Sequence, residues 1–204
     1  MRIENYNNQM EKIINAHQKE GVKPKLLLHS CCAPCSSAVI ERLKDVFDLT
    51  VYYYNPNLDS EKEFELRAEE QKRLCSLFNV KCVVEPFNSE EFLSQVKGLE
   101  EEMEGGKRCA KCFYIRLKKS AQMAKEGDYD YFTTTLTISP LKNANMLNTI
   151  GNAVGKEVGV MFLPSDFKKK NGYYRSIELS KQYELYRQNY CGCIFSKAAL
   201  PREQ

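Results

Sequence analysis

Hydrophobic and polar positions along this chain repeat with two periods, one typical of helices and the other typical of strands. Apolar residues at helical spacing predict helices over residues 4–19, 36–47, 60–78, 89–96, 110–125, 143–158 and 177–189. Short runs of apolar, β-branched and aromatic residues predict strands over residues 25–29, 50–54, 81–84, 131–136 and 160–163. Because strands alternate with helices, we expect an α/β fold with a parallel sheet of about five strands and helices on both faces.

Length and composition favour one domain over residues 1–204. Hydrophobic residues make up 43% of the chain and charged residues 28%, as in a soluble globular protein. We expect an N-terminal helix within residues 1–22, and a C-terminal segment, residues 164–204, that closes the functional site. The first residues lack the apolar core of a signal peptide, and no apolar run is long enough to cross a membrane. We therefore expect a cytoplasmic protein without a membrane partner.

The cysteines carry the strongest chemical signal. Structural disulfides are disfavoured in a reducing compartment, and nine cysteines cannot all pair. Seven of them fall into three groups, which are Cys31, Cys32 and Cys35, then Cys109 and Cys112, and finally Cys191 and Cys193. Cys75 and Cys82 stand alone in apolar surroundings and are predicted to be small core residues. Clustered cysteines in a cytosolic enzyme indicate metal ligands or redox groups.

The predicted topology places two of these groups at helix starts. Cys31–Cys35 follows the first strand, at the sheet edge where α/β proteins carry their functional sites. Cys109 and Cys112 are three residues apart at the start of a helix, whose dipole favours thiolates. Seven thiols exceed the four that a zinc ion or a [4Fe–4S] cluster needs. The surplus could serve a second metal, a redox-active disulfide or an open substrate site.

Other interpretations remain open on the residues alone. Cys109 and Cys112 could belong to a structural zinc site, and Cys32-Ala33-Pro34-Cys35 could act as a thioredoxin-like CxxC motif. His29 could be a proton donor or a buried structural histidine. The formal charge of +3 is compatible with nucleic-acid binding but does not by itself indicate it. Lys168–Lys170 with nearby Arg175 is typical of an RNA-binding surface, or of a solvated loop.

Five stretches together resemble the QueH type of epoxyqueuosine reductase, and they extend from about residue 25 to residue 197. They are His29–Cys35 (HSCCAPC), Tyr54-Asn55-Pro56-Asn57 with Glu63 and Arg67, Glu104–Cys112 (EGGKRCAKC), Thr133–Pro140 (TTTLTISP), and Phe167–Ser196 with KNGYYRSIELSKQYELYRQNYCGCIFS. The resemblance implies a Rossmann-like fold and reductive removal of the epoxide oxygen of epoxyqueuosine, at the wobble position of tRNA, to give queuosine. It also implies a [4Fe–4S] cluster, a second mononuclear iron nearby and an external electron donor.

The resemblance also implies roles for the cysteines. We expect Cys32, Cys109 and Cys112 to hold the cluster. Cys31, Cys35 and the pair Cys191 and Cys193 would complete it and bind the second iron. In some family members an aspartate stands at the position that matches Cys35, so either side chain fits there. The candidate catalytic residues are Cys31, Cys35 and His29.

We expect the tRNA to contact the loop after the second strand and the basic C-terminal segment. Tyr54, Asn55 and Asn57 are predicted to contact the modified base, and Arg67 is predicted to reach a phosphate. The residues predicted to contact the anticodon stem are Lys168, Lys169, Lys170 and Arg175. Two other function classes remain, an ATP-dependent iron–sulfur enzyme that thiolates tRNA and a zinc-stabilised RNA-binding module without catalysis.

Overall fold

The computed structural model describes residues 5–188 and 190–198, so the predicted segments 1–22 and 164–204 extend beyond it at 1–4, 189 and 199–204. In chain order the elements are α1 (Tyr6–Glu20), β1 (Lys25–Ser30), α2 (Ala33–Leu43), β2 (Asp48–Tyr53), α3 (Glu61–Leu77), β3 (Lys81–Val84), α4 (Ser89–Gln95), α5 (Lys107–Glu126), β4 (Tyr131–Thr134), the 3₁₀ helix η1 (Thr135–Ile138), α6 (Ala144–Val158), β5 (Met161–Phe162), α7 (Gly172–Gln182) and α8 (Ile194–Ala198).

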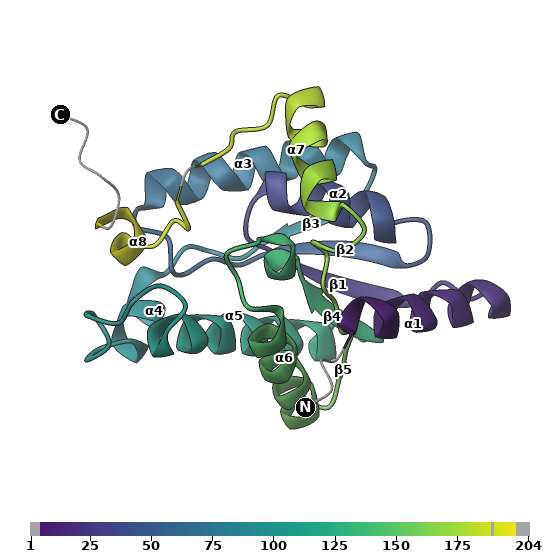
Figure 1. Ribbon diagram of the computed structural model, residues 1–204, viewed down its shortest axis with the longest axis horizontal. Coiled ribbons are helices and arrows are strands. Elements are labelled where there is room, and N and C mark those ends of the chain that lie inside the picture. The colour runs from purple at the N-terminus through teal and green to yellow at the C-terminus, as the bar shows by residue number, and fades with distance from the viewer. Residues whose placement is uncertain (1–4, 189, 199–204) are drawn as a thin grey trace.

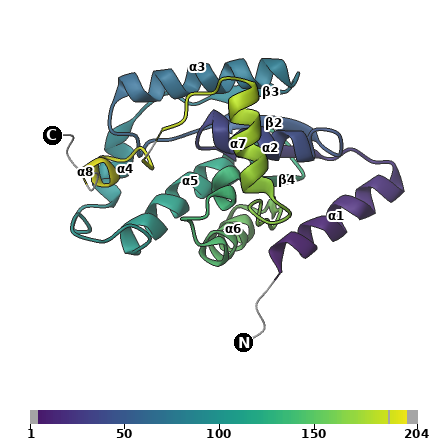
Figure 2. The same ribbon diagram turned by 45° about the horizontal axis from the view of Figure 1, so that its top comes forward.

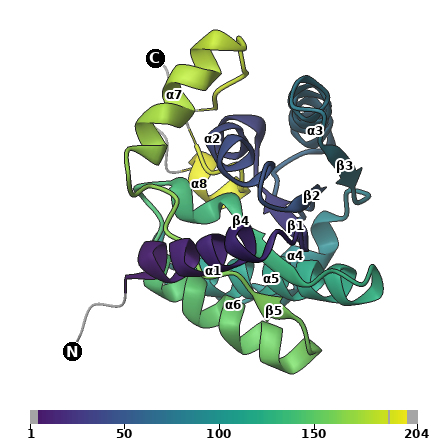
Figure 3. The ribbon, with the colours of Figure 1, turned by 90° about the vertical axis from the view of Figure 1, so that its right-hand side faces the viewer.

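The five strands form one parallel sheet in the order β3-β2-β1-β4-β5. Helices α2, α3 and α7 cover one face, and α5 and α6 cover the other (Figures 1 and 3). This arrangement confirms the predicted α/β fold. Among the described residues, no helix combines the length and the apolar character needed to cross a membrane.

The apolar side chains of β1 point alternately to the two faces of the sheet, which explains why helices cover both faces. Leu26 and Leu28 are fully buried in a core cluster with residues of α1, α2 and α3, whereas Leu27 is buried in a second cluster with residues of α5 and α6. Successive side chains of a strand point to opposite faces, so a run of leucines needs a helical layer on each side. The isolated Cys75 is buried in the first cluster, as predicted, and the partly buried Cys82 packs against that cluster.

The last predicted helix, 177–189, was placed wrongly. α7 begins at Gly172 and ends at Gln182, and the chain turns at Glu184, whose φ is +51°. The Leu185 N–H donates to the Ser180 carbonyl at 2.8 Å, and this turn buries the Leu185 side chain in the first core cluster. Burial of Leu185 therefore ends a helix that the sequence pattern would continue. Figure 2 shows the extended segment that runs from α7 to α8.

Candidate metal centre

The first cysteine group lies at the point where the order of the strands reverses. From β1 the sheet extends in one direction through β2 and β3, and in the other direction through β4 and β5. In open parallel sheets this reversal leaves a crevice outside the carboxyl ends of the strands, where ligands bind. Cys31 directly follows β1, and η1 directly follows β4, so both border this crevice.

Cys31, Cys32 and Cys35 hold their sulfur atoms within 4.8 Å of one another, close enough to share a metal ion. α2 begins at Ala33, three residues earlier than predicted, so Cys32 is its N-cap residue and Cys35 lies in its first turn. Hydrogen bonds from the Cys32 and Cys35 thiols hold the pKa of Cys31 well below its usual range. This shift favours the thiolate of Cys31, which is the form that binds metals.

Backbone amides support one cysteine in each of the other two groups. Cys109 lies in the first turn of α5, and its sulfur accepts a hydrogen bond from the Gly105 N–H at 3.2 Å. The Cys193 sulfur accepts one from the Ser196 N–H at 3.4 Å. A hydrogen bond to a sulfur atom favours its anionic form, but burial outweighs it and raises the pKa of Cys109, and the hydrogen bond to Cys191 together with burial raises the pKa of Cys193. Cys191 is already acidic, because a hydrogen bond from the Cys193 thiol lowers the pKa of Cys191 to about 5.

Two adjoining cavities bring the three groups together. The larger, of about 490 Å³, is lined by the first group and by Cys191. The smaller, of about 40 Å³, is lined by Cys191 and by three further cysteines, Cys109, Cys112 and Cys193. Both cavities share Glu104, Leu141, Lys142 and Cys191 as lining residues. All seven grouped cysteines thus border two cavities that share a wall, although the groups lie far apart in the sequence.

Arg116 provides a buried positive charge beneath the cysteines, and the sequence analysis missed it. Its side chain is only 2% exposed, and its guanidinium donates to Asn55 Oδ1 at 2.5 Å. Burial alone would lower its pKa, but the nearby charges of Cys112 and Cys31 outweigh that effect and raise the pKa above its ordinary value. The sequence did hold a signal, because Arg116 follows Cys112 by one helical turn on a buried face of α5.

Lys142 is a second cation at this site. It lies in the loop between η1 and α6 and lines both cavities. Burial lowers its pKa, but the charges of Cys191, Cys31 and Cys35 outweigh burial and raise the pKa above its ordinary value. The ammonium group therefore stays charged in the wall that the two cavities share.

His29 lies below the site rather than in it. It is fully buried, with Nδ1 2.8 Å from Thr134 Oγ1 and Nε2 3.1 Å from the Tyr54 carbonyl oxygen. Burial and the Arg116 charge lower the pKa of His29 to about 3, so the ring is neutral at physiological pH. Both ring nitrogens have polar partners inside the protein. His29 is not among the described residues that line the two cavities. This placement favours a positioning role for His29 over proton donation.

The residues predicted to contact the modified base occupy different environments. The Tyr54 ring stacks on Tyr52, with 6.0 Å between centroids, inside the second core cluster. Asn55 is held inside the protein by both ends of its side-chain amide. Its Oδ1 accepts from Arg116, and its Nδ2 donates to the Ser30 carbonyl at 3.0 Å. Asn57 lines the smaller cavity, and its buried Oδ1 has no hydrogen-bond partner in the part of the chain that the structure describes. Of these three residues, the structure brings only Asn57 to the cysteines.

Arg67 is buried in the wall of the larger cavity instead of reaching outwards to a phosphate. Its side chain is 2% exposed, and Nε donates to Glu63 Oε1 at 2.7 Å. The guanidinium carbon lies 5.4 Å from the centre of the Tyr190 ring. Arg67 thus packs against the segment that carries Cys191 and Cys193, which we call the C-terminal strap and define as residues 183–188 and 190–198.

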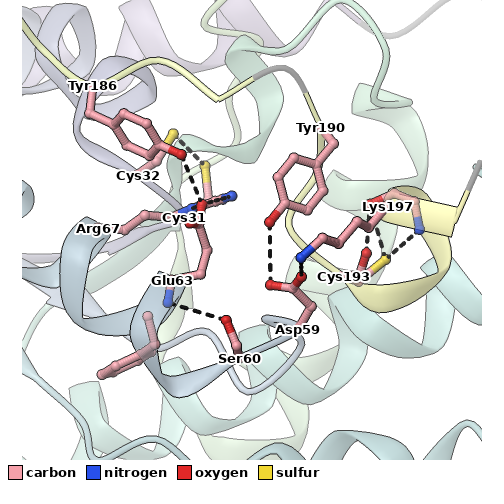
Figure 4. A network of polar contacts seen from close by, with 12 residues as sticks. Cys31, Cys32, Asp59, Ser60, Glu63, Arg67, Tyr186, Tyr190, Cys193 and Lys197 are labelled. Atoms are coloured by element: carbon pink, nitrogen blue, oxygen red, sulfur yellow. Dashed lines mark hydrogen bonds and ion pairs between the residues drawn. The ribbon is translucent and has the colours of Figure 1, made fainter. Parts of the chain in front are cut away.

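Asp59 holds the C-terminal strap against the loop between β2 and α3 (Figure 4). Its N–H donates to the Gly192 carbonyl at 2.9 Å. Its carboxylate accepts from the Tyr190 hydroxyl at 3.3 Å and pairs with the Lys197 ammonium at 2.5 Å. These contacts flank Cys191 and Cys193, and they explain how a segment remote in sequence supplies sulfur atoms to the crevice of the sheet.

We expect the change Gly192→Ala to displace the strap and to lower the metal content of the protein. The φ of Gly192 is +104°, and an added Cβ would lie 2.4 Å from Leu58 Cδ2 and 2.7 Å from Arg67 Nη1. Because both neighbours are buried, we expect the strap with Cys191 and Cys193 to shift, and overpacking of this kind costs about 1–3 kcal/mol. Iron per chain after anaerobic reconstitution and the urea midpoint of unfolding measure the effect.

The matched control is Gly98→Ala. Gly98 also has a left-handed backbone, with a φ of +83°, but an added Cβ would meet no atom of the described residues within 4 Å. Both variants carry the backbone strain of a left-handed alanine, about 1–2 kcal/mol, and only Gly192→Ala adds a steric conflict. Equal iron content in the two variants would contradict a positioning role for Gly192.

The residues predicted to contact the anticodon stem lie around a different cleft. Lys169, Lys170 and Arg175 line a cleft that also contains Glu11 and Glu41. Lys170 pairs with Glu11 at 3.4 Å, and Arg175 pairs with Glu41 at 2.8 Å. Lys168 similarly pairs with Asp166 at 2.6 Å. Three of these four cations are therefore already neutralised, and within the described structure they line neither cysteine cavity.

Comparison with known proteins identifies the family. Residues 26–199 match the family model described as epoxyqueuosine reductase QueH. A relative from Streptococcus pyogenes with the same description is 44% identical over 198 residues, which cover 94% of this chain and 78% of the relative. A relative from Thermotoga maritima is 35% identical over 174 residues, which cover 84% of this chain and 89% of the relative.

A solved structure shares the fold. The U34-tRNA thiolase NcsA from Methanococcus maripaludis, solved with its [4Fe–4S] cluster, aligns with a TM-score of 0.53 at 15% sequence identity. The alignment covers 93% of this chain and 67% of the thiolase. At this identity the likeness shows the fold alone, whereas the family match and the relatives cover most of the chain. The chain belongs to the QueH family of epoxyqueuosine reductases.

Proposed function

We propose that this protein is an epoxyqueuosine reductase, an oxidoreductase that acts on the wobble nucleoside of tRNA. One observation supports this proposal most: in a member of that family, seven cysteines from three distant groups line two adjoining cavities that share Cys191. In the reaction, epoxyqueuosine takes up two electrons and two protons and gives queuosine and water. The electrons come from an external low-potential donor.

The residues at the site fit iron bound by thiolates. The site offers sulfur ligands, amide donors to Cys109 and Cys193, and the buried cation Arg116 to balance negative charge. We propose that the ligands of a [4Fe–4S] cluster include Cys32, Cys109 and Cys112, and that the remaining grouped cysteines, Cys31, Cys35, Cys191 and Cys193, complete it and bind a second iron. When bound, such groups supply one-electron transfer and a Lewis acid for oxygen.

The protein itself contributes the binding site for the nucleoside. The larger cavity, about 490 Å³, lies within the range of small-molecule sites, roughly 300–1,000 Å³. Pro34, Leu136 and Ile138 give it apolar walls, which exclude water from the cysteines. Tyr173 and Arg187 also line it, and they offer an aromatic face and a cation for a base and a phosphate.

Conversion of the modified nucleoside tests the proposed function. The protein is reconstituted with iron and sulfide without oxygen and mixed with dithionite and tRNA that contains epoxyqueuosine. We expect digestion and mass spectrometry to show queuosine, with two electrons consumed per nucleoside. A protein that holds zinc and leaves epoxyqueuosine unchanged would support a non-catalytic zinc module instead. Insertion of sulfur that depends on ATP would support the tRNA-thiolating class.

Charge removal tests the proposed contact between residues 168–170 and the anticodon stem. We expect the triple change of Lys168, Lys169 and Lys170 to Gln to weaken tRNA binding and its salt dependence. Because Lys168 and Lys170 already pair with carboxylates, the slope of log K against log salt should fall by about one unit rather than three. Binding titrations at four salt concentrations measure this slope, with the exposed Lys125→Gln as the control. Identical slopes in the triple variant and the control would place the tRNA surface elsewhere.

A further inference from the structure

The Lys142 side chain is held in the site by a well-defined loop. The Lys142 N–H donates to the Ser139 carbonyl at 3.3 Å, which closes a turn directly after η1. The next residue, Asn143, caps α6, because its side-chain oxygen accepts from the Met146 N–H at 3.1 Å. Lys142 therefore stands between two fixed backbone segments, and its side chain borders both cysteine cavities.

The two cations of the site differ in what they bind. The guanidinium of Arg116 is already engaged by Asn55 Oδ1 at 2.5 Å and lies 3.3 Å from His29 Nε2. No hydrogen bond or ion pair joins the Lys142 ammonium to any residue that the structure describes. Glu104 lines both cavities as well, but among the described ion pairs it has none with Lys142. A half-buried ammonium with three unused donors is costly unless another group supplies acceptors.

The substrate brings one acceptor that its product lacks. Epoxyqueuosine and queuosine differ by the epoxide oxygen, which leaves as water. As the two C–O bonds break, negative charge develops on that oxygen, and two electrons from the external donor and two protons complete the reaction. A cation fixed beside this oxygen would interact more strongly in the transition state than in the ground state.

We propose that Lys142 binds the epoxide oxygen of the substrate through its ammonium group. This inference rests on the proposed function, since it assigns a residue to that reaction. Lys142 acts as a charged hydrogen-bond donor throughout, and its place in the lining of both cavities brings it to the cysteines. It therefore selects the epoxide over the product and stabilises the departing oxygen.

Binding without turnover gives the most direct test. Oxidised holoenzyme is titrated, in the absence of reductant, with two tRNAs that carry either epoxyqueuosine or queuosine. We expect the wild type to prefer the epoxide by about tenfold, as for one hydrogen bond to a charged group. Lys142→Met should bind both tRNAs equally, within about twofold, at the affinity that the wild type has for the queuosine tRNA. Lys142→Arg should keep part of the preference, because it keeps a cation.

Turnover and metal content separate this role from that of a counter-ion for thiolates. We expect Lys142→Met to lower kcat by about 10²-fold or more, as for loss of an oxyanion donor, with iron and sulfide content unchanged. Lys156→Met, at the exposed far end of α6, is the control and should match the wild type.

Two results would overturn the inference. The first is an undiminished preference for the epoxide in Lys142→Met. The second is a loss of iron in Lys142→Met that Lys142→Arg restores, with equal weakening of both tRNAs in Lys142→Met, which would make Lys142 a counter-ion. Failure of the wild type to convert epoxyqueuosine tRNA would instead refute the proposed function itself, and the inference with it.

Discussion

Replacing Arg116 with Met is expected to abolish most of the epoxide reduction and to lower the iron content of the protein. The change keeps the length of the side chain but removes the buried positive charge near Cys112 and Cys31. It also leaves Asn55 Oδ1 without its donor, which costs about 1–3 kcal/mol for a buried group. Without this charge, several thiolates would have to share one apolar site, which electrostatic repulsion opposes.

The measurements for Arg116→Met are iron per chain after reconstitution, urea unfolding and the rate of queuosine formation. The control is Arg42→Met, which removes a half-buried arginine that bonds to Asn7 and Glu11 and lies in the last turn of α2, at the end away from the cysteines. We expect the control to lose little activity, because it leaves the cysteines untouched. If Arg116→Met kept the iron content and the activity of the control, the buried charge would play no part at the site.

Removal of the metal is expected to release the C-terminal strap. The strap contacts the rest of the protein through Asp59 and Arg67, and the proposed metal ligands Cys191 and Cys193 would add covalent links to α2 and α5. Structural metal sites contribute about 10 kcal/mol or more in small domains. Since 1 kcal/mol corresponds to about 2–4 °C in a domain of this size, we expect the Tm of the chelated protein to fall by more than about 10 °C.

Limited proteolysis localises this effect. We expect trypsin to cleave at the exposed Arg187 at least about tenfold faster in the chelated protein, because the strap opens more often when its links to the metal are lost. Cleavage at Lys125, at the end of α5, provides an internal reference and should change much less. Equal rates at Arg187 with and without metal would contradict a metal-linked strap.

The fold was largely predictable because the local pattern and the topology agree. The pattern of apolar residues predicted all five strands. The family resemblance is confirmed by the match over residues 26–199. The errors lie where tertiary contacts override the local pattern. α7 ends at Gln182 because Leu185 packs into the core. The start of α2 at Ala33 is an exception, because Pro34 in its first turn is a local signal for a helix start.

The site was less predictable, because hydrophobic periodicity does not reveal what a charged or polar side chain faces. Arg116 and Arg67 are among the largest fully buried side chains, although arginine on a helix usually faces solvent. Tyr54 follows β2 at the sheet edge, but its ring turns into the core instead of towards the crevice. The strap reaches the crevice through Asp59, a contact across more than a hundred residues that no local signal encodes.

Iron analysis of cysteine variants tests most directly whether the three groups form one site. Wild-type protein and the changes Cys35→Ser, Cys112→Ser and Cys193→Ser, one from each group, are reconstituted without oxygen, with the core change Cys75→Ser as the control. We predict about five iron atoms and four sulfides in the wild type, those of one [4Fe–4S] cluster and one further iron, and the same in the control. Each of the three group variants should bind less iron. A wild type without iron, or a loss confined to one group, would contradict a shared site.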